Sequence, residues 1–506
     1  MAELVCAVDI GTSSCRAIVV DERGAAVGRA KETYSIERPR QEFEEQDPDE
    51  IRDAVWRTIG RCVANTKHPE AIRALSFSSQ LYSLIALDGA GRPLTNSILW
   101  SDGRAALQAR AIAAENDTQE LYRTTGCPPS SIYPIAKLRW LREVEPELFA
   151  TARRFVSIKE YVLSELLNEA LVDWSIASAT GMFDIRRREW DARAVVAGGV
   201  SKERLSQPFD GAIAHAATNP ERLRSLGLSA ETKIVLGGGD GPLANVGSGA
   251  VAPGAINIDL GTSGAIRAAV DSPFTDDRAA GWCYCLNHDR WVYGGILTNV
   301  GNALAWVAGL GAGPTPRTRE TPGQLMQSIA ALPHEPGELM FLPYLRPVRS
   351  PYWNAELSGT LLGLRPEHDR RHIGRALVEA IAFDLRTTSA LVERAVPNTG
   401  PLVLSGGLAR SPIVAQTIAT VLNRRLYTRE NTEASLLGAA VLGFRALGLL
   451  PDLAFSRGTV DGAGTTDAKC YEPEENLVGP YSSRYERYTN AVDAVRTLVA
   501  SWEGKR

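Results

Sequence analysis

Long apolar runs and surplus positive charge are absent from this sequence of 506 residues. No uncharged apolar stretch approaches the ~20 residues of a membrane helix, and the N-terminal segment shows no basic region followed by an apolar one. We therefore expect a cytoplasmic protein with no membrane partner. With 55 Lys plus Arg against 59 Asp plus Glu, the net charge of −4 also argues against a nucleic-acid partner, because nucleic-acid binders carry basic surfaces.

Cysteine is scarce and odd in number. The seven cysteines are scattered along the chain, unlike a secreted disulfide framework, so we interpret them as reduced thiols. Cys283 and Cys285 could ligate a metal, but no second pair lies near them, and alternate positions in a strand explain their spacing more simply. Histidine offers little as well, since His368 and His372 are helically spaced and are predicted to face solvent.

Two common nucleotide-binding fingerprints are missing. Neither the Gly-Lys-Ser/Thr of a P-loop nor a Gly-x-Gly-x-x-Gly within a βαβ unit occurs, which excludes the P-loop and Rossmann classes. What is present is typical of a soluble globular chain, with 44% hydrophobic and 23% charged residues. The length predicts two or more lobes, and ligand sites often lie between lobes.

A strand, a tight turn and a second strand are predicted twice. The apolar residues 4–10 are followed by Gly11-Thr12-Ser13 and a second apolar run, and residues 255–260 are followed in the same way by Gly261-Thr262-Ser263. The carboxylates before the turns, Asp9 and Asp259, are 259 − 9 = 250 positions apart. A repeat spaced by half the chain predicts two similar lobes that arose by duplication.

Helices and strands are mixed elsewhere, which predicts an α/β fold. Helical spacing covers residues 48–63, 135–148, 370–396, 411–422 and 434–447, and strand-like runs cover 72–78, 84–87 and 402–404. Small residues and proline cluster at 247–253, where we place the boundary between the lobes.

The two Gly/Ser/Thr turns are candidate phosphate sites. Such a turn directs backbone N–H groups into one concavity, and two facing turns could hold a triphosphate. Asp9 would repel phosphate unless a cation intervened, and Mg²⁺ is the natural mediator. The alternative is that each hairpin is an ordinary tight turn in which Asp or Thr caps local N–H groups.

Glycine-rich strand ends mark two more candidates. Gly237 to Gly239 precede Asp240, which is well placed to accept a proton from a hydroxyl nucleophile; the alternative is that Asp240 is a helix N-cap. Gly406 and Gly407 follow the strand at 402–404 and could pass beneath an adenine or a ribose.

Polar residues in the first half could surround a polyhydroxylated ligand. Trp100 offers an apolar face, and Gln80, Asp102 and Arg104 offer hydrogen bonds to hydroxyl groups. The alternative is that Trp100 belongs to the core and that Asp102 and Arg104 form a surface ion pair.

In their residues and in their order along the chain, these motifs resemble those of the FGGY carbohydrate kinases, within the sugar kinase, Hsp70 and actin superfamily. The likeness covers residues 4–450 and includes Lys137-Leu-Arg-Trp140 and Gly359-Thr-Leu-Leu-Gly363. The signature stretches depart from the family pattern at Val144 and Leu377.

The resemblance implies two similar ribonuclease H-like lobes of the actin-like ATPase type with an active-site cleft between them. It implies an N-terminal sugar-binding lobe at 1–247, an ATP-binding lobe at 248–455 and an extension at 456–506 that packs on the lobes. Asp240 is then the catalytic base, Asp9 the residue beside Mg²⁺, and ATP the phosphoryl donor. The implied ATP-binding residues are Gly11, Thr12, Ser13, Gly261, Thr262, Gly406 and Gly407, and the implied sugar-binding residues are Gln80, Tyr82, Trp100, Asp102, Arg104, Lys159 and Asp240.

Within the family, the stretches at 157–161, 173–184 and 240–245 look most like gluconate kinases, followed by xylulose kinases. We therefore expect phosphoryl transfer to a primary hydroxyl of an open-chain sugar acid or ketose, with D-gluconate favoured. Tyr82 stands where both groups usually show His, which alters a sugar-contacting position. The rival functions are a superfamily ATPase that works by nucleotide-driven shape change and a kinase-like fold that has lost catalysis and only binds sugar. The sequence leaves a homodimer open.

Overall fold

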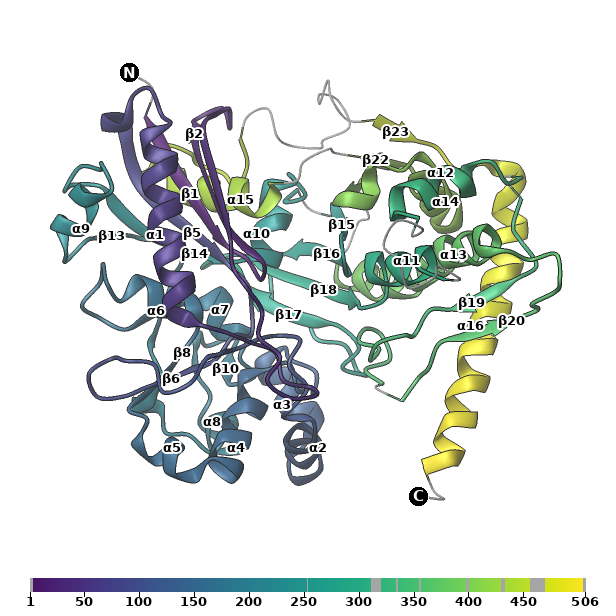
Figure 1. Ribbon diagram of the computed structural model, residues 1–506, viewed down its shortest axis with the longest axis horizontal. Coiled ribbons are helices and arrows are strands. Elements are labelled where there is room, and N and C mark those ends of the chain that lie inside the picture. Colours follow the sequence, from purple (N-terminus) through teal and green to yellow (C-terminus); the bar gives the residue numbers. More distant parts are fainter. Residues whose placement is uncertain are drawn as a thin grey trace. The chain divides into compact units, whose positions relative to one another are not determined.

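The chain folds into two compact units, seen in a computed structural model that describes residues 3–252, 254–310, 320–333, 335–354, 356–396, 400–428, 433–455 and 469–503. Unit 1 comprises residues 1–251, 269–293 and 433–459, and unit 2 comprises 252–268, 294–432 and 460–506. Each unit contains the greater part of one β-sheet (Figure 1). The part of the predicted extension at 456–468 lies outside the described residues.

The sheet of unit 1 has the order β13-β14-β5-β1-β2-β3. Strands β1 and β2 form the predicted first hairpin, while β1, β5 and β14 run parallel to one another. Every residue of β1 is buried, because helices cover both faces of this sheet. The strands are β1(Leu4–Ile10), β2(Ser14–Asp21), β3(Ala26–Thr33), β5(Ile72–Ser79), β13(Ala214–Ala216) and β14(Lys233–Gly239).

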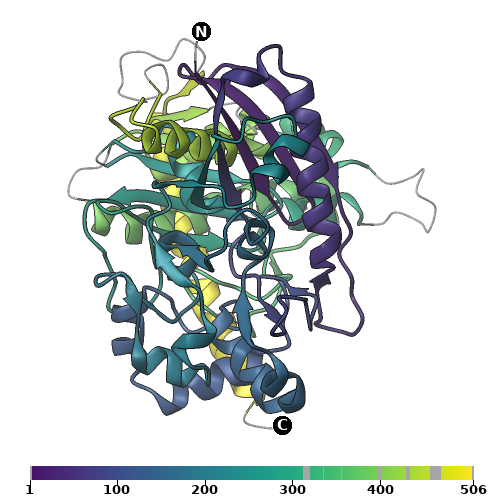
Figure 2. The same cartoon turned by 90° about the vertical axis from the view of Figure 1, so that its left-hand side faces the viewer.

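Helix α1(Pro48–Ala64) packs along β2 and β3, as both views show (Figures 1 and 2). Asp47 starts it by accepting hydrogen bonds from two backbone N–H groups, and Pro48 occupies the first turn, where no N–H donor is needed. The other face is packed by α15(Ala434–Ala446). A Cβ atom at Gly443 would lie 2.7 Å from Val5 Cγ1, so this close approach requires glycine.

The second sheet repeats the plan of the first. Its order is β17-β18-β16-β15-β21-β22-β23, in which β15 and β16 form the second hairpin and β21 runs parallel to β15. Apart from β17, the strands of the two sheets correspond one to one, in the order β3-β2-β1-β5-β14-β13 in the first sheet and β18-β16-β15-β21-β22-β23 in the second. Its strands are β15(Ile256–Leu260), β16(Gly264–Val270), β17(Trp282–Cys285), β18(Trp291–Leu297), β21(Leu402–Ser405), β22(Leu426–Thr428) and β23(Lys469–Tyr471). The α/β fold of two similar lobes is confirmed.

The remaining elements surround these sheets. In unit 1 they are β4(Glu45–Gln46), η1(Pro69–Ala71), β6(Ile85–Leu87), β7(Ser97–Ile98), α2(Ala106–Glu115), α3(Thr118–Thr125), α4(Pro134–Val144), α5(Pro146–Thr151), β8(Arg154–Val156), α6(Ile158–Leu163), β9(Leu171–Asp173), α7(Trp174–Ser178), β10(Phe183–Asp184), β11(Glu189–Trp190), α8(Ala192–Ala197), η2(Lys202–Arg204), β12(Gln207–Phe209), α9(Pro220–Ser225) and α10(Asp240–Gly247). In unit 2 they are α11(Gly301–Ala308), α12(Pro322–Ala330), β19(Met340–Leu342), β20(Thr360–Leu362), α13(Arg370–Ala395), η4(Gly407–Arg410), α14(Pro412–Leu422) and α16(Glu475–Glu503).

One predicted helix is two helices. The pattern at 135–148 is divided at Glu145 into α4 and α5, because Pro146 disfavours the helical conformation of the residue before it. Cys283 and Cys285 lie in β17, as predicted, and every cysteine in the described part of the chain is a free thiol. Among the described helices, none has the combination of length and apolar character that a bilayer span demands.

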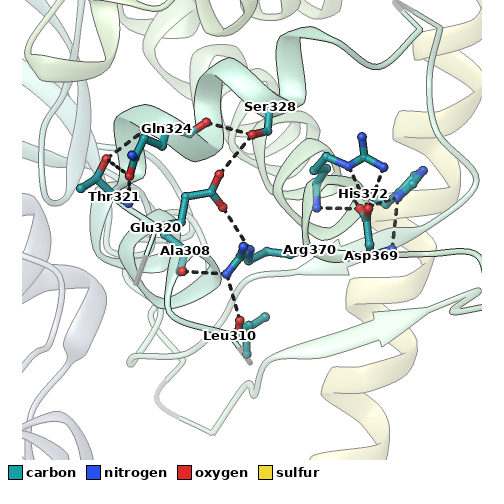
Figure 3. A network of polar contacts seen from close by, with 10 residues as sticks. Ala308, Leu310, Glu320, Thr321, Gln324, Ser328, Asp369, Arg370 and His372 are labelled. Atoms are coloured by element: carbon teal, nitrogen blue, oxygen red, sulfur yellow. Dashed lines mark hydrogen bonds and ion pairs between the residues drawn. The ribbon is translucent and has the colours of Figure 1, made fainter. Parts of the chain in front are cut away.

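Two partly exposed histidines lie at the start of α13. His368 precedes the helix, and His372 forms a capping box with the N-cap residue Asp369 (Figure 3). Arg370, the first residue of α13, forms an ion pair with Glu320 at 3.1 Å and donates to the carbonyl oxygen of Leu310 at 3.2 Å. These contacts connect the first turn of α13 to residues that follow α11 and precede α12.

Candidate active site

Three predicted site segments meet at one edge of the unit 1 sheet. Asp9, Gln80 and Asp240 lie at or just beyond the carboxyl ends of β1, β5 and β14. These strands are parallel neighbours, with Asp9 opposite Ser78 and Ser78 opposite Gly238. In open α/β sheets, ligands bind beyond the carboxyl ends of the strands.

The first Gly-Thr-Ser turn is fastened at Thr12. The Thr12 hydroxyl donates to Gln80 Oε1 at 3.2 Å and accepts from Trp100 Nε1 at 3.0 Å, and Gln46 donates to the Thr12 carbonyl oxygen at 2.7 Å. Trp100 is half-buried, so it is not a core residue, and its indole N–H joins a predicted sugar residue to a predicted phosphate residue. Ser13, at the tip of the turn, is exposed.

Asp9 is buried and held by two donors. Its Oδ1 accepts from the Ser78 hydroxyl at 2.7 Å, and its Oδ2 accepts from Arg16 at 2.6 Å. Burial disfavours a charged guanidinium, but Asp9, and then Glu433 and Asp240, raise the pKa of Arg16 above its usual value. Sequence reasoning missed Arg16; the signal was its place in β2 directly opposite Asp9.

Asp240 begins α10 and is half-buried. The N-cap of this helix is Gly239, so the alternative that Asp240 is the cap is wrong. An N-cap side chain accepts from the second or third residue after it, and the second residue after Asp240 is Pro242, which has no N–H. The Asp240 carboxylate instead accepts from the adjacent Gly241 N–H at 2.7 Å.

Lys159 lies inside the protein, with a side chain that is 2% exposed. Its Nζ is 2.6 Å from Asp173 Oδ2 and donates to the carbonyl oxygens of Leu236 and Gly238, at 2.9 Å each. Burial lowers the pKa of Lys159, and Asp173 opposes this shift. The structure therefore places Lys159 against the strand that leads to Asp240.

Asp102 and Arg104 form a buried ion pair, so the alternative of a surface pair is wrong. Arg104 contacts Asp102 Oδ2 at 2.7 Å and Glu45 at 2.5 Å. Its guanidinium also stacks 3.8 Å from the ring centre of Phe43. Asp102 accepts in addition from the Glu44 N–H at 2.8 Å. Through these contacts, both side chains hold the segment around β4 and β7 in place.

Tyr82 is also drawn into the interior. Its hydroxyl lies 3.1 Å from that of Tyr284, and Tyr133 reaches the same Tyr284 hydroxyl at 3.0 Å. The backbone of Tyr82 has φ 69°, a conformation that is strained for a bulky residue. Lys137 holds it there by donating to the Tyr82 carbonyl oxygen at 2.7 Å and to that of Leu99 at 2.8 Å.

Unit 2 brings its own candidate residues together. In the second hairpin, the Gly261 N–H donates to the Ser263 carbonyl oxygen at 2.9 Å, and the exposed Thr262 accepts at its carbonyl oxygen from Asn302 N–H at 3.0 Å. Gly406 has φ 89°, and a Cβ atom there would lie 2.6 Å from Asp259 Oδ1, so glycine is required. Beside Gly407, in contrast, a Cβ atom would meet no atom within 4 Å.

Gly407 in unit 2 is suited to a nucleotide, and Asp9 in unit 1 is suited to a divalent cation. Gly407 leaves its backbone open to the approach of a flat group. Asp9 retains a second lone pair on each oxygen. Mg²⁺ is commonly held by one or two carboxylates together with phosphates and waters, so Asp9 is a suitable protein ligand.

A hollow of about 770 Å³ lies elsewhere in unit 1. Its lining includes Trp174, Phe209, Ile213, His288 and Arg445 and none of the predicted site residues. The candidate site is therefore defined by the strand ends, not by this hollow.

Two units built on one strand order, each with an acidic strand end and a Gly-Thr-Ser hairpin, define the actin-like ATPase class of fold. Comparison with known proteins narrows this class. Residues 4–247 match the N-terminal domain of the FGGY family of carbohydrate kinases, and residues 257–447 match its C-terminal domain. The chain belongs to the FGGY family of carbohydrate kinases, and it is a phosphotransferase with an alcohol group as acceptor.

Similar proteins include two kinases of Bacillus subtilis (strain 168). The gluconokinase is 34% identical over 456 residues, covering 88% of each chain. The xylulose kinase is 26% identical over 503 residues, covering 98% of this chain and 97% of the other. A crystal structure of gluconate kinase from Lactobacillus acidophilus has a TM-score of 0.90 at 29% identity and covers all of both chains. The resemblance seen in the motifs is confirmed.

Proposed function

We propose that the protein is an ATP-dependent kinase of an open-chain sugar acid, with D-gluconate as the favoured substrate. The supporting observation is the placement of Asp240, half-buried at the first position of α10 beyond three glycines. Such a carboxylate can orient a primary hydroxyl and accept its proton. Similarity to the gluconokinases of Bacillus subtilis and Bacillus licheniformis, at 34% and 33% identity, supports a sugar acid as the substrate.

We assign the predicted residues separate roles in phosphoryl transfer. When bound, Mg-ATP supplies the phosphoryl group and neutralises its charge, in a loose transition state that needs positioning more than covalent help. Thr12, Ser13 and Thr262, with the glycines beside them, would hold the phosphates through hydroxyl and backbone N–H groups. Asp9 would hold the cation, and Gly406 and Gly407 would line the adenosine.

The same residues allow two alternative functions. A neutral ketose such as xylulose is favoured by one observation: Arg104 and Lys159, the two cations among the implied sugar-binding residues, are both engaged inside the protein. Burying a sugar acid's charge without a partner would be costly. An ATPase without sugar phosphorylation has no such support, because both FGGY domains match.

Steady-state kinetics with a sugar panel test the proposal. ADP release is measured with ATP and gluconate, D-xylulose, L-ribulose, glycerol or erythritol, and we expect the highest kcat/KM for gluconate. A neutral sugar that exceeds gluconate by more than tenfold refutes the sugar acid and leaves the kinase. No turnover with any of them refutes the proposed substrate classes.

A further inference from the structure

The Lys159 ammonium is engaged on three sides inside unit 1. It donates to the carbonyl oxygens of Leu236 and Gly238 and forms an ion pair with Asp173 Oδ2 at 2.6 Å. A lysine so buried and paired already has its charge partner inside the protein, so it does not need a sugar carboxylate. Two of its acceptors, however, belong to the last residues of β14, immediately before Asp240.

Asp173 contributes to the same arrangement from a second side. Its Oδ1 accepts from the Ile176 N–H at 2.9 Å, which makes Asp173 the N-cap of α7. In that helix, the Ser175 hydroxyl accepts from the Gly239 N–H at 3.0 Å. The carbonyl oxygens of Leu236 and Gly238 and the amide of Gly239 are therefore all fixed by one cluster of buried side chains.

The end of β14 needs such support because its ladder is irregular. Pairing with β5 shifts register between Val235 and Gly238, and Gly237 has φ 67°. A Cβ atom at Gly237 would lie 1.8 Å from the Phe77 carbonyl oxygen, so the close approach excludes any other residue. Three consecutive glycines are the most flexible backbone a strand can have, and the ladder alone does not determine their course.

We propose that Lys159 and Asp173 are a positioning pair that fixes the backbone of Gly237 to Gly239 and thereby the place of Asp240. The inference rests on the proposed function, because it takes Asp240 as the group that meets the acceptor hydroxyl. Misplacement of a reacting group by about 1 Å can cost about 10²-fold in rate. The pair therefore acts on kcat, whereas a sugar-binding lysine would act on KM.

The test replaces both partners together, because removing one leaves an unpaired charge buried. Lys159→Met keeps the length of the side chain, and Asp173→Asn keeps the acceptor that caps α7. The control replaces an exposed ion pair of the same unit, Arg193→Met with Glu120→Gln. Both double variants are also made in an Asp240→Asn background.

If the pair acts through Asp240, its loss matters only while Asp240 is present. We expect kcat to fall about 10- to 100-fold in the protein that retains Asp240 and less than threefold in the Asp240→Asn background, with sugar and ATP KM within threefold. Equal falls in both backgrounds overturn the proposal. A raised sugar KM at unchanged kcat also overturns it and makes Lys159 a substrate ligand.

Hydrogen exchange of the backbone amides at 233–247 provides a readout that needs no turnover. We expect at least fivefold faster exchange in the Lys159/Asp173 variant and no change in the control; unchanged exchange in the Lys159/Asp173 variant overturns the proposal. Lys159→Leu with Asp173→Asn serves the same comparison if the first double variant does not fold. A wild-type protein without activity on any sugar refutes the proposed function instead, and the exchange experiment still tests the pair.

Discussion

Two aspartates that look alike in the sequence have different surroundings in the fold. Asp9 lies near the end of β1, two residues before Gly11, and Asp240 follows β14 between two glycines. Asp9 is buried, and its charge is balanced by Arg16 at 2.6 Å. Asp240 is half-buried at a helix start, where it accepts from the neighbouring Gly241 N–H. A balanced, buried carboxylate suits a structural or cation-holding role, whereas an accessible one suits proton transfer.

Asp240→Asn is expected to lower kcat by about 10² to 10⁴, the range for a positioned general base, with little change in ATP and sugar KM. The amide keeps the shape of the carboxylate and loses its basicity. Turnover is measured by ADP release under saturating substrates.

The matched control is Asp117→Asn. Asp117 is the N-cap of α3, and asparagine caps a helix about as well as aspartate, so kcat should not change. Turnover of the Asp240→Asn protein within threefold of wild type would remove Asp240 from catalysis.

Thr12→Val is expected to lower kcat/KM for ATP by about 10- to 100-fold, since the loss of a hydrogen bond to a charged group, here a phosphate of ATP, costs about 1.5–3 kcal/mol. The change also deprives Gln80 and Trp100 of a shared partner. Initial rates are measured against ATP at saturating sugar. Thr151→Val, at the exposed end of α5, is the control, and an equal effect there would contradict a specific role for Thr12.

At the scale of elements, the C-terminal helix α16 is part of the core of unit 2. Leu477, Tyr481, Tyr488 and Val492 are buried along one side of it, and Arg484 contacts the buried Glu379 of α13 at 2.8 Å. Tyr488 and Tyr344 donate to Asp384 Oδ1 at 2.9 and 3.2 Å. Polar groups so buried are favourable only while each has its partner.

Asp384 should make unit 2 less stable as the pH rises. Burial raises the pKa of Asp384 from 3.8 to about 7, although its two tyrosine hydrogen bonds oppose the shift. The folded state therefore keeps this proton between those pH values, where the unfolded state has lost it. The resulting stability is fully present below pH 3.8 and is lost as the pH rises through about 7.

Asp384→Asn removes this titration. Relative to wild type, the variant should gain about 1–4 kcal/mol of unfolding free energy between pH 5 and pH 8, at ~1.4 kcal/mol for each pKa unit. Urea denaturation of both proteins at the two pH values measures the difference. Asp493→Asn, on an exposed part of α16, should show no such change, and a pH-independent difference at Asp384 would contradict the raised pKa.

At the scale of the whole molecule, the chain passes between its units more than once. Helix α15 belongs to unit 1 although its sequence follows most of unit 2, and Gly438 of α15 packs against α10, where a Cβ atom would lie 2.0 Å from the Leu243 carbonyl oxygen. Each unit nevertheless contains the greater part of one sheet and buried side chains of its own, so we expect damage to one core to leave the other unaffected.

Tyr122→Phe and Tyr488→Phe test this independence. The Tyr122 hydroxyl donates to Asp276 at 2.8 Å in unit 1, and the Tyr488 hydroxyl donates to Asp384 at 2.9 Å in unit 2. Each loss should cost about 1.5–3 kcal/mol. Because the two sites share no partner, the double variant should equal the sum within about 0.5 kcal/mol in urea denaturation. A coupling above ~1 kcal/mol would show that the units share a cooperative core.

The sequence by itself determined the features that local chemistry controls. The two hairpins, the helix at 48–63 and the glycine-rich strand ends lie where the pattern placed them. Strand and turn preferences act over a few residues, and an unobstructed turn needs glycine wherever it occurs. The order of these motifs also carried the family, which the matched domains confirm.

Only the tertiary structure decided how the charged side chains are used. Lys159 and Arg104 are predicted to contact the sugar, and the fold pairs Lys159 with Asp173 and Arg104 with Asp102 and Glu45. Whether a cation faces a ligand or a buried carboxylate depends on which distant segments the packing brings beside it. A buried charge must find a partner inside the protein, and that partner cannot be read from the residues next to it in the sequence.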